Sequence, residues 1–200
     1  MLIDNQGYVK VADLGYAKYV KGARTYSTLG TVTYTPPELI HGRGRTTASD
    51  WWCCGVLLHE MLTGEPPFVG TTSRDVLQSV VDYAADSGAN DALLTQLTAT
   101  GMSGAAAQLI TGLLRVDDTS RLGMSGFRPI LEHPWFAGLD WVALLRRELA
   151  APYLPPADYV LPDASDRVDP DVLLRRDFDS ERWAAVFDQF GPMAKLHDDL

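Results

Sequence analysis

Residues 8–15 read Tyr8-Val9-Lys10-Val11-Ala12-Asp13-Leu14-Gly15, an alternating strand that ends at a carboxylate beside a glycine. Residues 4–7, Asp4-Asn5-Gln6-Gly7, have the chemistry of a tight turn, and Gly7 can adopt a positive φ without steric cost. Together they predict a β-hairpin over residues 2–13, with its second strand over residues 8–12. The following residues, 19–48, are rich in Thr, Ser, Gly and Pro and show no sustained periodicity. A long irregular stretch inside a compact domain is usually functional or disordered.

The rest of the chain is predicted to be mainly α-helical. Residues 51–62 follow the candidate caps in residues 47–50, and they are apolar almost all round. We therefore expect this helix to be buried on every side, with Cys53 and Cys54 as core packing. Further helices are predicted over residues 74–85 (cap Ser73), 104–116 (cap Ser103), a short segment begun by Pro129, and residues 141–150 (cap Asp140).

Composition narrows the class of protein. No apolar run approaches the roughly 20 residues that span a bilayer, and no secretory signal is visible at Met1, so the sequence predicts a cytoplasmic protein without a membrane partner. The net charge is −9, and residues 137–200 carry seven basic and thirteen acidic residues, a balance of −6. Such an acidic segment would repel phosphates, which argues against nucleic-acid binding. Scattered histidines and two adjacent cysteines argue against a zinc site.

Several motifs occur in one order: Asp13-Leu14-Gly15, a Ser/Thr-rich loop over residues 24–31, Tyr34-Thr35-Pro36-Pro37-Glu38, Ser49-Asp50-Trp51-Trp52 and His133-Pro134-Trp135-Phe136. This order resembles serine/threonine protein kinases of the AGC group, closest to the cyclic-AMP- and cyclic-GMP-dependent members, from Leu2 to about Leu154. The resemblance implies a protein-kinase-like fold, of which this chain holds the large lobe, with a short β-hairpin and an AGC-type tail. It also implies ATP and Mg²⁺ as cofactors and protein or peptide substrates.

The resemblance assigns roles to residues near the strand end and in the loop. Asp13 matches the Asp of the Asp-Phe-Gly motif, which binds Mg²⁺ at the ATP phosphates. Ser27 matches the phosphorylated position of the activation loop, with Thr28 as the alternative, and Lys18 matches a contact of that phosphate. The segment Leu29-Gly30-Thr31 resembles the part that receives the substrate. There the Thr31 hydroxyl is expected to support the catalytic loop.

Three further residues match structural positions of these kinases. Glu38 corresponds to the Glu of the Ala-Pro-Glu motif, and Arg121 corresponds to its distant partner in a buried ion pair. Loss of one member of such a pair typically costs about 3–5 kcal/mol. Asp50, at the start of the central helix, corresponds to an Asp that holds the backbone of the catalytic loop.

The resemblance divides the chain into a kinase-domain part, residues 1–136, and an AGC-type tail, residues 137–200. In these kinases the tail presents a Phe-Asp motif beside the adenine. Two candidates exist, Phe178-Asp179 and Phe187-Asp188-Gln189-Phe190. The second carries an aromatic residue at both ends, so Phe187 and Phe190 are the preferred contacts of the nucleotide.

The 200 residues contain no Gly-rich loop, no Val-Ala-Ile-Lys strand and no His-Arg-Asp catalytic loop. The matched segment begins one residue after the catalytic loop of these kinases, so the chain is expected to be a fragment that is inactive alone. The alternative is a non-catalytic docking module. A partner that binds cyclic nucleotides, as a segment or a subunit, is implied by the resemblance, which leaves the cyclic-AMP and cyclic-GMP types open.

Overall fold

The computed structural model describes residues 1–20, 23–26 and 30–156 of the chain. They fall into two units, which are considered separately: Met1–Asp13 with the segment from Ala150 onward, and Leu14–Leu149. The described elements are mainly helices, with one two-stranded antiparallel sheet. The mainly α fold class is therefore confirmed.

The hairpin occupies the first unit. Strand β1 (Leu2–Ile3) pairs with strand β2 (Val9–Lys10), with Leu2 opposite Lys10. The turn forms because Asp4 Oδ1 accepts hydrogen bonds from the backbone N–H groups of Gln6 and Tyr8, and Gly7 has a φ of 83°. The hairpin is as predicted, but β2 is shorter than the predicted residues 8–12. A Cβ on Gly7 would collide with the Ala151 side chain and the Tyr153 carbonyl, so the turn and residues 151–153 are closely packed.

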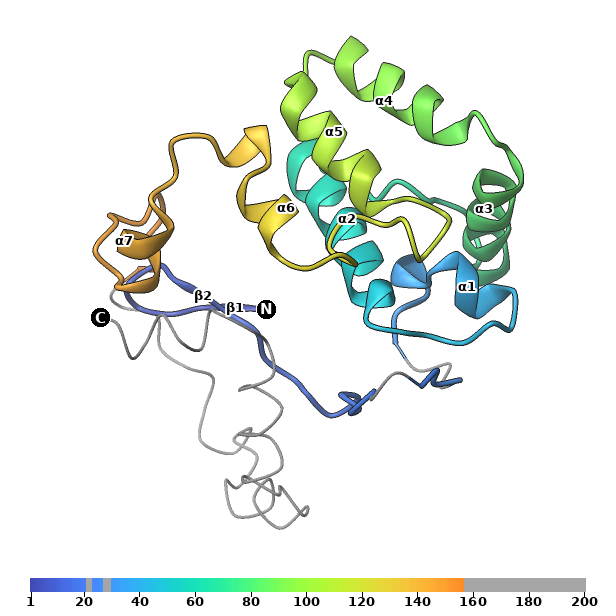
Figure 1. The fold of residues 1–200 in the computed structure, drawn as a ribbon, viewed down its shortest axis with the longest axis horizontal. Helices are drawn as coiled ribbons and strands as arrows, with labels where there is room; N and C mark the ends of the chain where they lie inside the picture. Colours follow the sequence, from blue (N-terminus) through green and yellow to red (C-terminus); the bar gives the residue numbers. More distant parts are fainter. Residues whose placement is uncertain (21–22, 27–29, 157–200) are drawn as a thin grey trace. The chain divides into compact units, whose positions relative to one another are not determined.

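The second unit is built around two helices in contact, α2 (Ala48–Thr63) and α5 (Gly104–Leu113). Helix α5 begins at Ser103, whose Oγ accepts from the Ala106 N–H, as predicted, and α2 ends at Gly64 in the left-handed conformation. Figure 1 shows α5 between α2 and α4. The core contains the predicted face of α5 and one face of α2: Trp52, Val56, Leu58, Ala107, Leu109, Ile110, Leu113 and Leu114.

Helix α2 is not buried on every side, so that prediction was wrong. Cys54 is exposed, and Met61 and Leu62 keep 62% and 44% of their accessible surface. The elements that contact α2, chiefly α5 and the 3-10 helix η1 (Val32–Tyr34), leave this second apolar face uncovered among the described residues. Cys54 is therefore not core packing.

Helices α3 (Ser73–Ala85) and α4 (Ala89–Ala99) complete this side of the unit. The cap of α3 is Thr72 rather than the predicted Ser73, because the Thr72 and Asp75 side chains form a reciprocal capping box. Helix α4 was not predicted. Asn90 on α4 holds it in place by donating to the Tyr83 hydroxyl at 2.8 Å and to the Thr111 carbonyl at 3.0 Å.

The remaining elements are short. They are α1 (Pro37–Ile40), α6 (Arg128–Leu131), the 3-10 helix η2 (Pro134–Phe136) and α7 (Trp141–Leu145). Pro129 lies in the first turn of α6 and Asp140 caps α7, as predicted, but α7 ends five residues before the predicted Ala150 because Arg147 adopts a positive φ.

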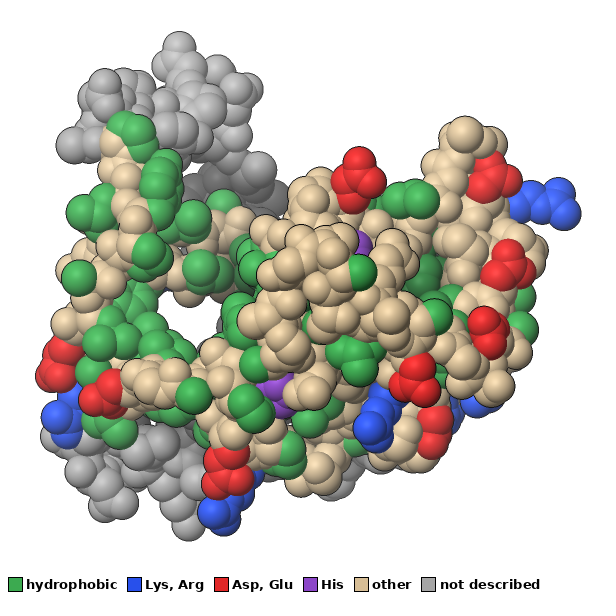
Figure 2. Space-filling model, turned by 90° about the horizontal axis from the view of Figure 1, so that it is seen from above, with side chains coloured by type: hydrophobic (Ala, Val, Ile, Leu, Met, Phe, Trp, Pro, Cys, Tyr) green, Lys and Arg blue, Asp and Glu red, His purple; other side chains and the backbone are tan. Residues whose placement is uncertain are grey.

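Two features of the described residues concern membranes and the distribution of surface charge. In the part of the chain that the structure describes, no helix has the length and apolarity to cross a membrane. Carboxylate side chains are scattered over the face shown in Figure 2 rather than gathered into one cluster.

Candidate functional site

The segment from Gly30 to Glu38 is fixed to the helical unit by a buried ion pair. The guanidinium of Arg121 donates to both carboxylate oxygens of Glu38, at 3.0 and 2.9 Å. Both side chains are 0% exposed. Ser49 Oγ, at the start of α2, donates to the same carboxylate at 2.7 Å. The pair that the sequence suggested is therefore present.

Arg121 joins this segment to both central helices. Its Nη1 also donates to the Ala48 carbonyl in the first turn of α2, at 2.8 Å, and its Nε donates to the Arg115 carbonyl after α5, at 2.9 Å. Its guanidinium carbon lies 5.1 Å from the centre of the Trp52 ring, in cation–π contact. Burial of the charge is thus accompanied by hydrogen bonds, as a stable buried charge requires.

The protonation of Glu38 follows from these contacts. Burial by itself would raise the pKa of this carboxyl, but the hydrogen bonds and positive charge of Arg121, together with the Ser49 hydroxyl, lower the pKa below its usual value. Glu38 is therefore charged at neutral pH, which is the state that the bidentate bond to Arg121 needs.

A second attachment holds the same segment to α2, and sequence reasoning missed it. The Tyr34 hydroxyl donates to Glu60 Oε2 at 2.8 Å, and Cys53 Sγ donates to the Tyr34 carbonyl at 3.4 Å. Burial and the Glu60 carboxylate raise the pKa of Tyr34 to about 12, so the hydroxyl remains a donor at neutral pH. No local sequence pattern signals a bond between residues so far apart.

Two residues of the predicted substrate segment, Gly30 and Thr31, are described by the structure, and they precede the two attachments. Thr31 is exposed at the N-terminus of η1, and Gly30 has a φ of 119°, a conformation that a residue with a side chain rarely adopts. Asp50 is exposed in the first turn of α2. No hydrogen bond to its carboxylate comes from the described residues, so it can accept bonds from a further segment.

Asp13 ends the first unit. It has a φ of 62°, a left-handed conformation that non-glycine residues adopt rarely and that concentrates at functional positions. The described residues hold no group of three or more His, Cys, Asp or Glu side chains that could bind a metal ion by themselves. A single carboxylate is nevertheless compatible with Mg²⁺, which commonly binds one or two carboxylates and completes its shell with water and substrate phosphates.

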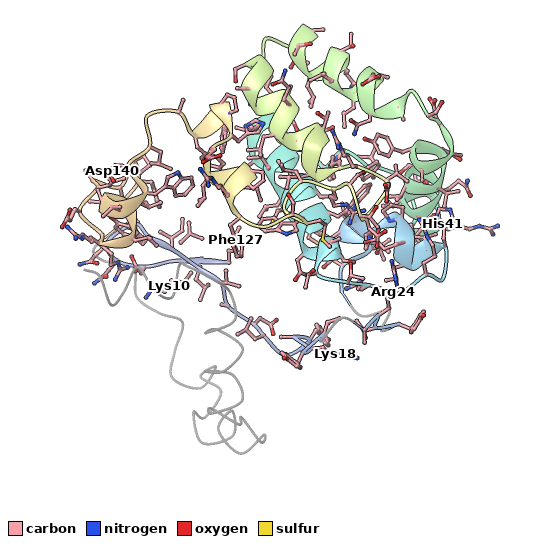
Figure 3. The ribbon with its side chains drawn as sticks, viewed as in Figure 1. Lys10, Lys18, Arg24, His41, Phe127 and Asp140 are labelled. Carbon is pink, nitrogen blue, oxygen red and sulfur yellow. The ribbon has the colours of Figure 1, made fainter. Side chains whose placement is uncertain are left out.

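Lys18 and Arg24 lie at different distances from the helices of the Leu14–Leu149 unit. Figure 3 shows Lys18 on a segment apart from the helices of its unit, whereas Arg24 lies beside the loop that follows α1. Several predicted residues lie outside the described part of the chain: Ser27, Thr28, Leu29, Phe178, Phe187 and Phe190.

Comparison with known proteins identifies the family. The model of the protein kinase domain matches residues 1–136. The chain belongs to the protein kinase family. Among curated proteins, this kinase chain is 36% identical to the serine/threonine-protein kinase AtPK1/AtPK6 of Arabidopsis thaliana, over 78% of its own length and 31% of that protein's. It is 33% identical to the ribosomal protein S6 kinase alpha-2 of Homo sapiens, over 90% and 23%. It is 35% identical to the cAMP-dependent protein kinase catalytic subunit 2 of Drosophila melanogaster, over 78% and 42%.

These relatives are AGC-type serine/threonine kinases, and the kinase chain spans between about a quarter and two fifths of their lengths. The helices and the hairpin of its described residues agree with the large lobe of such a kinase. The identities to the S6-kinase and cAMP-dependent relatives are similar. They therefore identify the AGC group but do not distinguish between its subtypes.

Proposed function

We propose that this chain supplies the large lobe of a serine/threonine kinase that transfers the γ-phosphoryl group of ATP to protein hydroxyl groups. The observation that carries the proposal is the double attachment of residues 30–38, through Glu38 to Arg121 and through Tyr34 to Glu60. Phosphoryl transfer depends on positioning, because the protein does little covalent chemistry itself. Tyr34 and Glu38, which closely follow the proposed substrate-receiving residues, are held to α2 and to Arg121, and such a fixed attachment meets that requirement.

The proposed roles follow the matched positions. Asp13 would hold Mg²⁺, which when bound neutralises charge on the transferred phosphoryl group. Thr31 and Asp50 would hold a catalytic loop, and Leu29, Gly30 and Thr31 would receive the substrate. Lys18 would pair with a phosphate on Ser27 or Thr28, and Phe187 and Phe190 would contact the adenine from a tail formed by residues 137–200. The cytoplasmic location and a cyclic-nucleotide-binding partner stay predictions.

We propose further that the 200 residues alone do not phosphorylate a basic peptide, since they contain none of the segments that cradle the ATP phosphates or accept the hydroxyl proton. A chimera tests the large-lobe role. The part of the Drosophila relative that precedes its matched segment is joined to Met1, and phosphate transfer from labelled ATP to a basic peptide is measured.

The chimera is expected to be active, and Asp13→Ala is expected to lower its kcat at least about a hundredfold, because the metal at the phosphates loses its carboxylate. Asp91→Ala, at an exposed position of α4, is the control and should leave the rate unchanged. A folded but inactive chimera that still binds the peptide would favour the docking-module alternative. Activity that survives Asp13→Ala would exclude the proposed metal role.

A further inference from the structure

Arg24 makes a set of contacts that none of the proposed roles explains. Its Nη2 lies 3.0 Å from Asp118 Oδ2, in the loop after α5. Its Nη1 donates to the carbonyls of Arg43 and Gly44, at 3.3 and 3.2 Å. One guanidinium thus joins three stretches of the chain in the Leu14–Leu149 unit, and Figure 3 shows Arg24 at this position beside the loop that follows α1.

The ion pair differs from an ordinary surface pair in its burial. The Asp118 side chain is only 7% exposed, and that of Arg24 is 36% exposed. Exposed pairs contribute little, because water screens the charges and the side chains lose entropy when they meet. A carboxylate that is almost fully buried has lost its hydration, so the loss of its cationic partner is costly.

Backbone contacts extend the attachment to the next two residues. Thr25 and Arg45 exchange a pair of backbone hydrogen bonds, at 3.0 and 2.7 Å, and so form a short antiparallel bridge. The Tyr26 ring lies over Gly44, where a Cβ would come within 2.9 Å of Tyr26 Cε1. Gly44 also has a φ of 78°, so both its conformation and the close ring favour glycine.

We propose that Arg24 is a positioning residue whose ion pair with Asp118 holds residues 24–26 against residues 43–45. Residues 24–26, which precede Ser27 in the sequence, are thereby fixed to the large lobe in the chain without any phosphorylation. If the proposed kinase function is correct, residues 24–26 begin the activation loop. The attachment of these residues to residues 43–45 does not depend on that function. A negative result in the exchange experiment below would therefore not change how the chimera assay is interpreted.

Amide hydrogen exchange on the 200-residue chain tests the attachment locally. Asp118→Asn removes the charge and keeps the shape of the side chain. It is expected to speed exchange at the Thr25 and Arg45 amides about tenfold, because the bridge opens more often when its anchor is lost. The Leu114 amide, which donates to the Ile110 carbonyl in the core, should keep its rate. The Arg24 side chain is partly exposed, and the Arg24→Gln variant is expected to speed exchange at the same two amides.

A double-mutant cycle isolates the pair. The Asp118→Asn and Arg24→Gln double variant should exchange no faster at Thr25 and Arg45 than Arg24→Gln alone, because Arg24→Gln already removes the ion pair together with the bonds to the Arg43 and Gly44 carbonyls. Glu132→Gln is the matched control, because it removes an ion pair to Arg128 that is exposed on both sides. Unchanged exchange at Thr25 and Arg45, additive effects, or equal acceleration at Leu114 would each overturn the proposal.

Discussion

Replacement of Arg121 by methionine is expected to lower the free energy of unfolding by about 3–5 kcal/mol, the usual cost of leaving one member of a buried ion pair without its partner. Methionine fills much of the volume of the arginine stem, so the loss comes from the charge rather than from a cavity. Glu38 would lose both guanidinium bonds on a fully buried carboxylate and keep the Ser49 hydrogen bond and the bond from its own backbone. Urea unfolding at neutral pH, followed by tryptophan fluorescence, measures the change.

The pH dependence gives a second readout of the same variant. In the unsubstituted chain the pKa of Glu38 is lowered, so its contribution to stability is present above the pKa of the unfolded chain and is lost as the pH falls through the folded pKa. Without Arg121, burial raises that pKa, so acid should stabilise the variant relative to the unsubstituted chain. The difference between the two chains is therefore expected to shrink as the pH falls toward 4.

Arg128→Met is the control, because it breaks a pair in which both partners are largely exposed. Its unfolding curve should match that of the unsubstituted chain. If Arg121→Met also left the curve unchanged at neutral pH, the ion pair would not stabilise this unit.

Substitution of Gly55 by valine is expected to cost about 3 kcal/mol through overpacking. A Cβ at this position of α2 would lie 2.9 Å from both the Leu113 Cβ and the Leu114 Cδ2. Those leucines are 4% and 0% exposed, so neither can move aside into solvent. The gain in helix propensity over glycine is smaller than this crowding. Thermal and urea unfolding of the 200-residue chain measure the loss.

Gly104→Val is the matched control. Gly104 opens α5, and nothing lies within 4 Å of the Cβ that would be added there. The same side chain should therefore be tolerated at Gly104 and not at Gly55. Equal effects at the two positions would show that the α2–α5 contact is not as close as described.

The sequence predicted those elements whose signals are local. Helix α5 was found because Ser103 caps it and its apolar residues recur at helical spacing. Helix α4 was missed because its threonines lower helix propensity and no side chain caps it. In the structure, Thr95 and Thr98 satisfy their hydroxyls by donating to carbonyls one turn earlier in the same helix.

Burial and long-range pairing were harder to predict. The apolar sequence of α2 indicated a buried helix, but it could not show that Cys54 and Met61 face away from α5. The pair of Glu38 and Arg121 was anticipated only through the resemblance to kinases. The contacts from Tyr34 to Glu60 and from Arg24 to Asp118 were not anticipated, because each depends on the tertiary fold rather than on spacing along the chain.

The bond between Arg121 and Glu38 closes a stretch of chain in which the two residues are 83 positions apart. A closure of this length loses chain entropy before any contact is gained, so we expect it to form after the local helices. An interaction that is made late affects the rate of unfolding more than the rate of folding. We therefore expect loss of Arg121 to raise the unfolding rate of the lobe more than it lowers the folding rate, which stopped-flow unfolding and refolding in urea would measure.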